Sequence, residues 1–136
     1  MDKTVILIKP DAVKKKVIGE IISRFEKAGF ILVGAKFVKL SDKLLDEWYA
    51  HHKEKPFFPG LKKFMTETPV MAMLWEGKDV VVRVRALCGP TDSTKAGKGT
   101  IRGDFGTDIQ QNAIHASEDE AAAKREADLI FLPQEI

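Results

Sequence analysis

A chain of 136 residues and 15.2 kDa has room for one domain, which we predict to span residues 1–136. With 44% hydrophobic and 31% charged residues, the composition excludes a disordered chain, and a net charge of +2 is too small to indicate nucleic acid as a partner. The single cysteine, Cys88, excludes an internal disulfide framework and is typical of a reducing compartment. Because no apolar run approaches the ~18 residues of a membrane span, we expect a cytoplasmic protein with no membrane partner.

The first third of the sequence alternates strand and helix patterns. The apolar, largely β-branched run 4–8 predicts a buried strand. Isoleucines and a phenylalanine at helical spacing from Ile18 onward predict a helix, and Gly29 stands where its C-terminal cap belongs. The run 31–40 predicts a second strand, and Ser41 predicts the N-cap of the helix that follows.

The middle of the sequence predicts one more strand, one more helix and a long loop. The apolar run 70–75 predicts a third strand, and valines at helical spacing predict a helix over 79–87. From Gly89 to Asn112 the periodicity disappears and glycines are frequent. A loop of this length is unusual in a compact domain, so we expect it to carry function.

The last part of the sequence predicts a helix followed by a strand. Ser117 and Glu120 have the spacing of a capping box, and the run 129–132 predicts a fourth strand. Strands that alternate with helices indicate a sheet covered by helices. We therefore predict an α/β (α+β) fold: a ferredoxin-like βαββαβ sandwich with an antiparallel four-stranded sheet, added helices and a long loop before His115.

Several common nucleotide and metal motifs are absent. Gly97-Lys98 is followed by Gly99, which breaks the phosphate-loop pattern. The triplet 104–106 reads Asp-Phe-Gly, but the other protein-kinase motifs are missing. His51 and His52 lack metal-binding spacing and have no cysteine nearby. We therefore predict no metal site built by the protein itself.

Groups that suit phosphate are concentrated in residues 85–117. Arginine forks match phosphate oxygens, glycines let backbone amides approach an anion, and a neutral imidazole can be a nucleophile near pH 7. Each residue taken alone is more often ordinary surface or structure. Taken together they indicate an anion site; its candidate residues are Arg85, Thr91, Arg102, Asn112, His115 and Ser117.

The segment 112–117, Asn-Ala-Ile-His-Ala-Ser, resembles the active-site signature of nucleoside diphosphate kinases. Further motifs of that family occur in the same order, and the resemblance covers essentially residues 3–133. They lie at residues 8–11, 19–30, 55–61 and 99–105.

The resemblance implies a ping-pong phosphotransferase in which a histidine accepts the γ-phosphoryl group of a nucleoside triphosphate and passes it to a nucleoside diphosphate. His115 matches the family's nucleophile. Lys9 matches a residue near the ribose and the transferring phosphoryl group, and Tyr49 matches the hydroxyl beside the histidine. Ser117 and Glu126 match the pair that orients the imidazole.

The resemblance also implies how the nucleotide binds. Arg85, Thr91 and Arg102 match groups that hold the phosphates, and Asn112 matches a second contact to the ribose. Phe57, Leu61 and Ile109 match the residues that form the slot for the base. Stacking contacts only the aromatic face that every base has, so the resemblance implies that the enzyme accepts nucleotides with different bases and with ribose or deoxyribose. Mg²⁺ would arrive on the nucleotide phosphates of ATP or another substrate. The family also implies a homo-oligomer, a tetramer or a hexamer.

Two departures from the family pattern stand out. Glu118 follows Ser117 where the family usually has aspartate, and we expect a modest effect because the position borders the last helix. The segment 91–98 lacks a proline found in many relatives, which predicts a change in loop rigidity and subunit packing.

Two non-enzymatic alternatives compete with this interpretation. An RNA-binding module of the same architecture would carry stacking aromatic residues on its central strands, but the predicted strands 4–8 and 129–132 lack such a pair. A ligand-sensing domain would not need His115 together with Arg85 and Arg102. The sequence therefore favours the enzyme.

Overall fold

A four-stranded antiparallel sheet, in the order β2-β3-β1-β4, forms the centre of the computed structural model, which describes residues 2–136. This order is that of a ferredoxin-like sandwich, so the predicted fold class is confirmed. The strands are β1 (Asp2–Ile8), β2 (Ile31–Val38), β3 (Val70–Gly77) and β4 (Ile114–Ala116).

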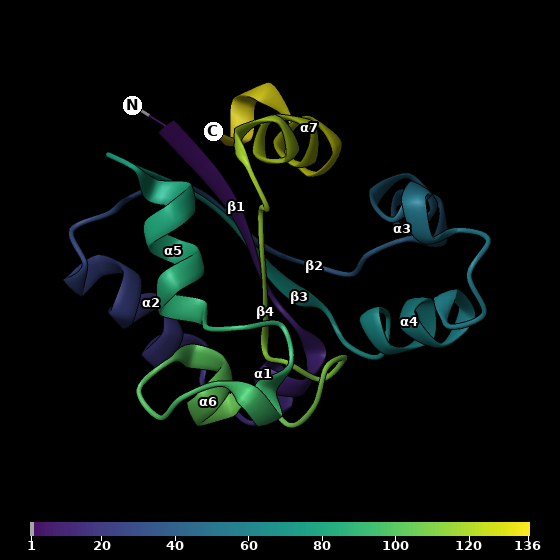
Figure 1. Ribbon diagram of the computed structural model, residues 1–136. Helices are drawn as coiled ribbons and strands as arrows, with labels where there is room; N and C mark the ends of the chain where they lie inside the picture. The colour runs from purple at the N-terminus through teal and green to yellow at the C-terminus, as the bar shows by residue number, and fades with distance from the viewer. Residues whose placement is uncertain (1) are drawn as a thin grey trace.

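Helices cover both faces of the sheet (Figure 1). In that view α2 and α5 lie to the left of the sheet, and α3, α4 and α7 lie to its right. No helix within residues 2–136 is both long and apolar enough to cross a membrane. The α-helices are α1 (Pro10–Lys14), α2 (Ile18–Lys27), α3 (Asp42–Trp48), α4 (Phe58–Met65), α5 (Val80–Cys88), α6 (Ile101–Phe105) and α7 (Glu120–Ile130). Short 3-10 turns are η1 (Ala50–His52), η2 (Ser93–Lys95) and η3 (Pro133–Glu135).

The two-residue period of β1 divides its side chains between two hydrophobic cores. Ile6 and Ile8 pack with the helices that include α2 and α5, whereas Val5 and Leu7 pack with α3, α4 and α7. Because helices pack against both sides of the sheet, both faces of β1 are buried, as its apolar sequence predicted.

Local signals for helix ends in the first half of the chain are confirmed. The Ser41 hydroxyl accepts a hydrogen bond from the backbone N–H of Leu44 at 3.1 Å, which caps α3. Gly29 follows α2 with a φ of +91°, a left-handed conformation that favours glycine at a helix end. The second strand ends at Val38, two residues earlier than predicted.

The predicted fourth strand at 129–132 is wrong. Leu129 and Ile130 form the last turn of α7, and the sheet is closed by Ile114–Ala116, which pairs with β1. The apolar run at 129–132 belongs to the buried side of a helix end, where Ile130 and Phe131 enter the core. The order of the last two elements is therefore strand then helix.

The predicted capping box and loop also need correction. Asp119, two residues after Ser117, caps α7 by accepting from the N–H of Ala122 at 2.7 Å. Ser117 is instead buried, with its hydroxyl engaged elsewhere. The long segment 89–113 is not structureless, because it contains η2 and α6.

Candidate active site

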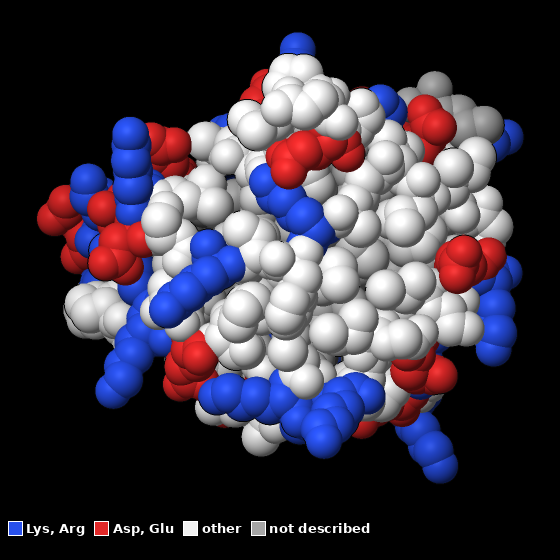
Figure 2. Space-filling model, turned by 180° about the vertical axis from the view of Figure 1, so that it is seen from behind, with Lys and Arg blue, Asp and Glu red and all other residues white. Residues whose placement is uncertain are grey.

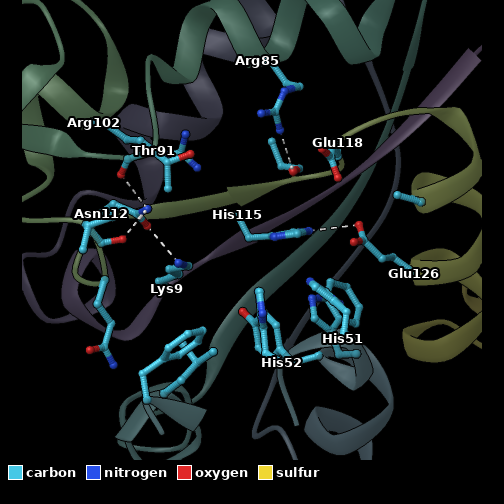
Figure 3. Close-up of a pocket in the computed structure, with 18 of the residues that line it drawn as sticks. Lys9, His51, His52, Arg85, Thr91, Arg102, Asn112, His115, Glu118 and Glu126 are labelled. Carbon is cyan, nitrogen blue, oxygen red and sulfur yellow. Dashed lines mark hydrogen bonds and ion pairs between the residues drawn. The ribbon is translucent and has the colours of Figure 1, made fainter. Parts of the chain in front are cut away.

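A cavity of about 630 Å³ opens beside β4, between the α3–α4 region, the 89–113 segment and α7 (Figure 3). Every predicted site residue except Ser117 lines it. These residues are Lys9, Tyr49, Phe57, Leu61, Arg85, Thr91, Arg102, Ile109, Asn112, His115 and Glu126. The structure thus brings together side chains that are up to 117 positions apart in the sequence, from 9 to 126.

β4 presents His115 to the cavity. Its neighbours Ile114 and Ala116 are buried on the opposite face, and His115 pairs with Leu7 of β1 in the sheet register. The His115 side chain is 18% exposed. In Figure 3 it lies between Lys9, Asn112 and Arg102 on one side and Glu126 on the other.

A chain of hydrogen bonds fixes one side of the imidazole. His115 Nε2 lies 3.0 Å from Oε1 of the buried Glu126. Ser117 Oγ donates to the same carboxylate oxygen at 2.7 Å and accepts from the N–H of Val5 at 3.0 Å. Because an ionised carboxylate only accepts, Nε2 carries the proton and the lone pair of the neutral ring is on Nδ1.

Lys9 and Arg102 bring positive charge to the cavity from buried positions. Lys9 is only 8% exposed, and its Nζ donates to Asn112 Oδ1 at 2.8 Å. Burial, together with the nearby Arg102 guanidinium, lowers the pKa of Lys9 to about 8, although Asp11 opposes the shift. Asn112 in turn donates to the carbonyl oxygen of Thr91 at 3.0 Å.

Arg102 is anchored by two backbone carbonyls. Its Nη1 donates to the carbonyl of Gly89 at 2.8 Å, and its Nη2 donates to that of Ile114 at 2.9 Å. Burial lowers the pKa of Arg102, but a guanidinium stays charged in proteins. Arg85 is more exposed, with Nη1 3.4 Å from the carbonyl oxygen of Ala116. With Arg125 of α7, the cavity is therefore lined by four cationic side chains.

Tyr49 lies at the end of α3, beside the same carboxylate. Burial, and secondarily the charge of Glu126, raise the pKa of Tyr49, so its hydroxyl keeps its proton. It is a hydrogen-bond donor available to the cavity.

The other end of the cavity is apolar and open. Phe57 is 52% exposed and Ile109 is 64% exposed. The centroids of the Phe57 and His52 rings lie 5.1 Å apart, and Lys55 Nζ lies 5.8 Å from the Phe57 centroid. This arrangement offers a flat aromatic face with little polar recognition.

Comparison with known proteins identifies the family. The sequence model of the family "Nucleoside diphosphate kinase" matches residues 2–136. The chain belongs to the nucleoside diphosphate kinase family. A nucleoside diphosphate kinase of Halorubrum lacusprofundi is 50% identical, over 99% of this chain and 86% of the relative, and one of Brevibacillus brevis is 48% identical, over 100% and 92%.

Solved structures of the family have the same fold as this chain. The Halobacterium salinarum nucleoside diphosphate kinase, in complex with CDP, superposes with a TM-score of 0.95 at 47% identity, covering 99% of this chain and 91% of that one. The Aquifex aeolicus nucleoside diphosphate kinase also superposes with a TM-score of 0.95, at 41% identity, covering 99% of this chain and 98% of that one. The reaction of this family is phosphoryl transfer between nucleotides by way of a histidine.

Some residues that shape the cavity were not among those predicted from the sequence. Asp11 Oδ2 accepts from the N–H of Ala113 at 2.9 Å and so holds the turn that enters β4. Ala113 has a φ of +72°, a strained conformation for a residue with a side chain. The signal for Asp11 was its place in the motif Ile-Lys-Pro-Asp, to which no role was attached.

Other cavity residues carried no predicted role. His51 and His52 were excluded as a metal site, yet both line the cavity, and so does Trp48, for which the sequence predicted no role. Glu118, the departure from the family pattern, lies near Arg85 in Figure 3. These residues gave no separate signal because only the fold brings them to one cavity.

The charges of the site suit phosphate better than a protein-held metal ion. Among residues 2–136, His, Cys, Asp and Glu side chains form no group of three that could hold a metal. Of the two carboxylates at the cavity, Glu126 is already bound to His115 and Ser117. The charged side chains that line the cavity are mostly cationic, which suits phosphate oxygens.

Proposed function

We propose that His115 Nδ1 accepts the γ-phosphoryl group of a nucleoside triphosphate and passes it to a nucleoside diphosphate. The observation that carries this assignment is the contact of Nε2 with Glu126, which leaves Nδ1 as the only ring nitrogen free to react. The same cavity supplies the cations that a transferring phosphoryl group needs.

The two half-reactions are the reverse of each other. The Nδ1 lone pair attacks the γ-phosphorus, an N–P bond forms, and the bond from phosphorus to the β–γ bridging oxygen breaks, which releases the diphosphate. A β-phosphate oxygen of the second diphosphate then attacks the phosphorus, and the N–P bond breaks. Through both steps Glu126 holds the Nε2 proton and stabilises the positive charge on the ring.

We assign the phosphates to the cationic end of the cavity. Arg102, Arg85 and Lys9 would balance the charge of the phosphate oxygens, with the Thr91 hydroxyl as a neutral donor. Mg²⁺ would bind to the nucleotide's own phosphate oxygens and neutralise charge there. The protonated Tyr49 hydroxyl would donate to an oxygen of the phosphoryl group on His115.

We assign the base to the exposed end. It would stack on Phe57 between Leu61 and Ile109, while Lys9 and Asn112 reach the ribose hydroxyls. The CDP complex of the related Halobacterium salinarum enzyme supports a nucleoside diphosphate as ligand. Because this end offers few polar groups, we expect broad tolerance of base and sugar.

We also propose that the chain acts as a single domain, in the cytoplasm, as a homo-oligomer. The lone thiol of Cys88 is buried, which suits a reducing compartment. β2 is an edge strand with Ile31, Leu32 and Phe37 exposed, and such an edge favours pairing with a second copy. Figure 2 shows a broad uncharged area on the side opposite to the view of Figure 1. Light scattering during size exclusion would measure the assembly.

Phosphoenzyme labelling tests the proposed chemistry. Purified protein is incubated with γ-labelled ATP and Mg²⁺, and the denatured protein is treated with acid or alkali. We expect label that survives alkali, is lost in acid, and leaves the protein when GDP is added before denaturation.

Two variants make the labelling specific. His115→Ala should take up no label while it still binds ADP, whereas His51→Ala, which removes another histidine at the same cavity, should still be labelled. Label on folded His115→Ala protein would contradict the assignment.

A further inference from the structure

Trp48 contacts the catalytic histidine and has no role in the proposed chemistry. It is the last residue of α3, directly before Tyr49, and it lines the cavity although only 2% of its surface is exposed. Its ring meets that of His115 edge to face, with centroids 5.2 Å apart and planes at 68°. This is a favourable aromatic geometry.

Hydrogen bonding does not explain why an indole occupies this place. Trp48 Nε1 is buried and has no hydrogen-bond partner within residues 2–136. A buried N–H without a partner lowers stability, so packing alone would favour a phenylalanine or a leucine. What the indole adds over those side chains is a longer and flatter surface that reaches the imidazole.

Contacts with two elements restrain the His115 ring. Glu126 of α7 holds Nε2 through a hydrogen bond, and Trp48 of α3 meets the ring itself. A rotation of the imidazole about its Cβ–Cγ bond would break the first contact and disturb the second. With both in place, the ring presents Nδ1 to the cavity in one orientation.

We propose that Trp48 is a positioning residue that holds the His115 imidazole in the orientation in which Nδ1 attacks. This inference rests on the proposed function of His115, because it gives a role to a residue that acts only through that ring. Phosphoryl transfer needs the attacking atom in line with the breaking bond, and a displacement of about 1 Å can cost roughly 10²-fold in rate.

Single-turnover kinetics separate positioning from nucleotide binding. We expect Trp48→Leu to lower the rate of phosphorylation by ATP by about tenfold or more, while the Kd for ADP changes by less than about twofold. Trp48→Phe should recover part of the rate, because a smaller aromatic ring keeps some of the contact.

Stability measurements separate positioning from a merely structural role. Trp48→Phe removes the unpartnered N–H, so it should melt within a few degrees of the unchanged protein and yet react more slowly. Trp75→Phe is the matched control, since Trp75 is a buried indole in the other core, against Phe25. Its Nε1 likewise has no hydrogen-bond partner within residues 2–136, so Trp75→Phe should also melt within a few degrees of the unchanged protein and should keep its rate of phosphorylation.

Nitrogen chemical shifts of the imidazole give a readout that needs no activity. In the unchanged protein the neutral His115 should carry its proton on Nε2, and Trp48→Leu should increase the fraction with the proton on Nδ1. Any of three results would overturn the inference. The first is a wild-type phosphorylation rate in both Trp48 variants, and the second is a rate that follows the melting temperature across all three variants. The third is an unchanged tautomer in Trp48→Leu. An unchanged protein that takes up no label would instead overturn the proposed function.

Discussion

The two ends of the cavity differ in how firmly the fold holds their side chains. At the end that we assign to the phosphates, Arg102, Lys9 and Asn112 are buried, and each is tied to the protein by hydrogen bonds of 2.8–3.0 Å. At the end that we assign to the base, Phe57 and Ile109 are exposed, and the Phe57 ring contacts His52 and Lys55.

This difference matches what each end has to recognise. Charge that develops during phosphoryl transfer is stabilised best by groups that are already fixed in place, so rigidity at that end contributes to rate. A base that stacks on an aromatic face tolerates some movement, and every base has such a face. We therefore expect the site to be strict about the reaction and tolerant of different bases.

Removal of Arg102 should break the rigid end and have the largest effect. Arg102→Ala deletes a charge and leaves the carbonyls of Gly89 and Ile114 without their donors. We expect the rate of phosphorylation by ATP to fall by about 10²–10³-fold and the melting temperature to fall as well. Stopped-flow or quenched-flow kinetics and thermal unfolding measure the two effects.

Arg83 offers a matched control for this change. It also donates to two backbone carbonyls, those of Lys78 and Ala28, and its guanidinium lies over Phe30, away from the cavity. Arg83→Ala should change stability with little effect on rate. If Arg102→Ala phosphorylates as fast as Arg83→Ala, Arg102 does not act on the phosphoryl group.

Removal of the aromatic face should have a smaller and uniform effect. Phe57→Ala should weaken binding of ADP, GDP and CDP alike, by about 1–3 kcal/mol, because stacking is lost while the base edges are unaffected. Ile109→Ala, at the same open end, should cost less than about 1 kcal/mol. Calorimetry with the three diphosphates measures the losses; a loss confined to one base would show that Phe57 helps to read base edges.

The smallest expected effect is the pH dependence that Lys9 introduces. Its pKa of about 8 means that Lys9 loses its charge as the pH rises from 7 to 9.5. Because a charged lysine binds phosphate more strongly, the Kd for ADP should rise over this range by about fivefold. Lys9→Met should bind more weakly at pH 7 but with a flatter profile, and an equally steep profile in that variant would exclude Lys9 as the titrating group.

The same titration affects stability in the opposite direction. Lys9 has a lower pKa in the folded chain than the ordinary lysine value of 10.5, so the unfolded chain binds more protons between pH 8 and 10.5. The contribution of Lys9 to the free energy of unfolding therefore increases with pH across this window. Rising pH would stabilise the fold through Lys9 while it weakens nucleotide binding.

How far the sequence could predict this molecule depends on the range of the interactions involved. The strand at 4–8, the cap at Ser41 and the turn at Gly29 follow from neighbouring residues, and they were predicted correctly. The closing strand was not, because Ile114–Ala116 is too short to show a period. The apolar run at 129–132 was the stronger local signal, although it ends a helix.

The site shows the same limit. The motif around His115, together with the other family motifs in the same order, indicated the family and, apart from Ser117, residues that line one cavity. Sequence gave no reason to pair His115 with Trp48, or to bury Ser117 between Glu126 and Val5 rather than use it as a cap.

The sequence by itself determined most of the local helices and strands and the types of side chain available to the site. Through several motifs in the same order as in the family, it also determined the family. Tertiary structure alone decided which segment closes the sheet, which ring nitrogen of His115 is free, and which aromatic residue meets it. The physical reason is that these contacts depend on pairing between β4 and β1 and on the packing of α3 and α7 against the sheet. Those interactions join residues far apart in the chain, and no local pattern encodes their geometry.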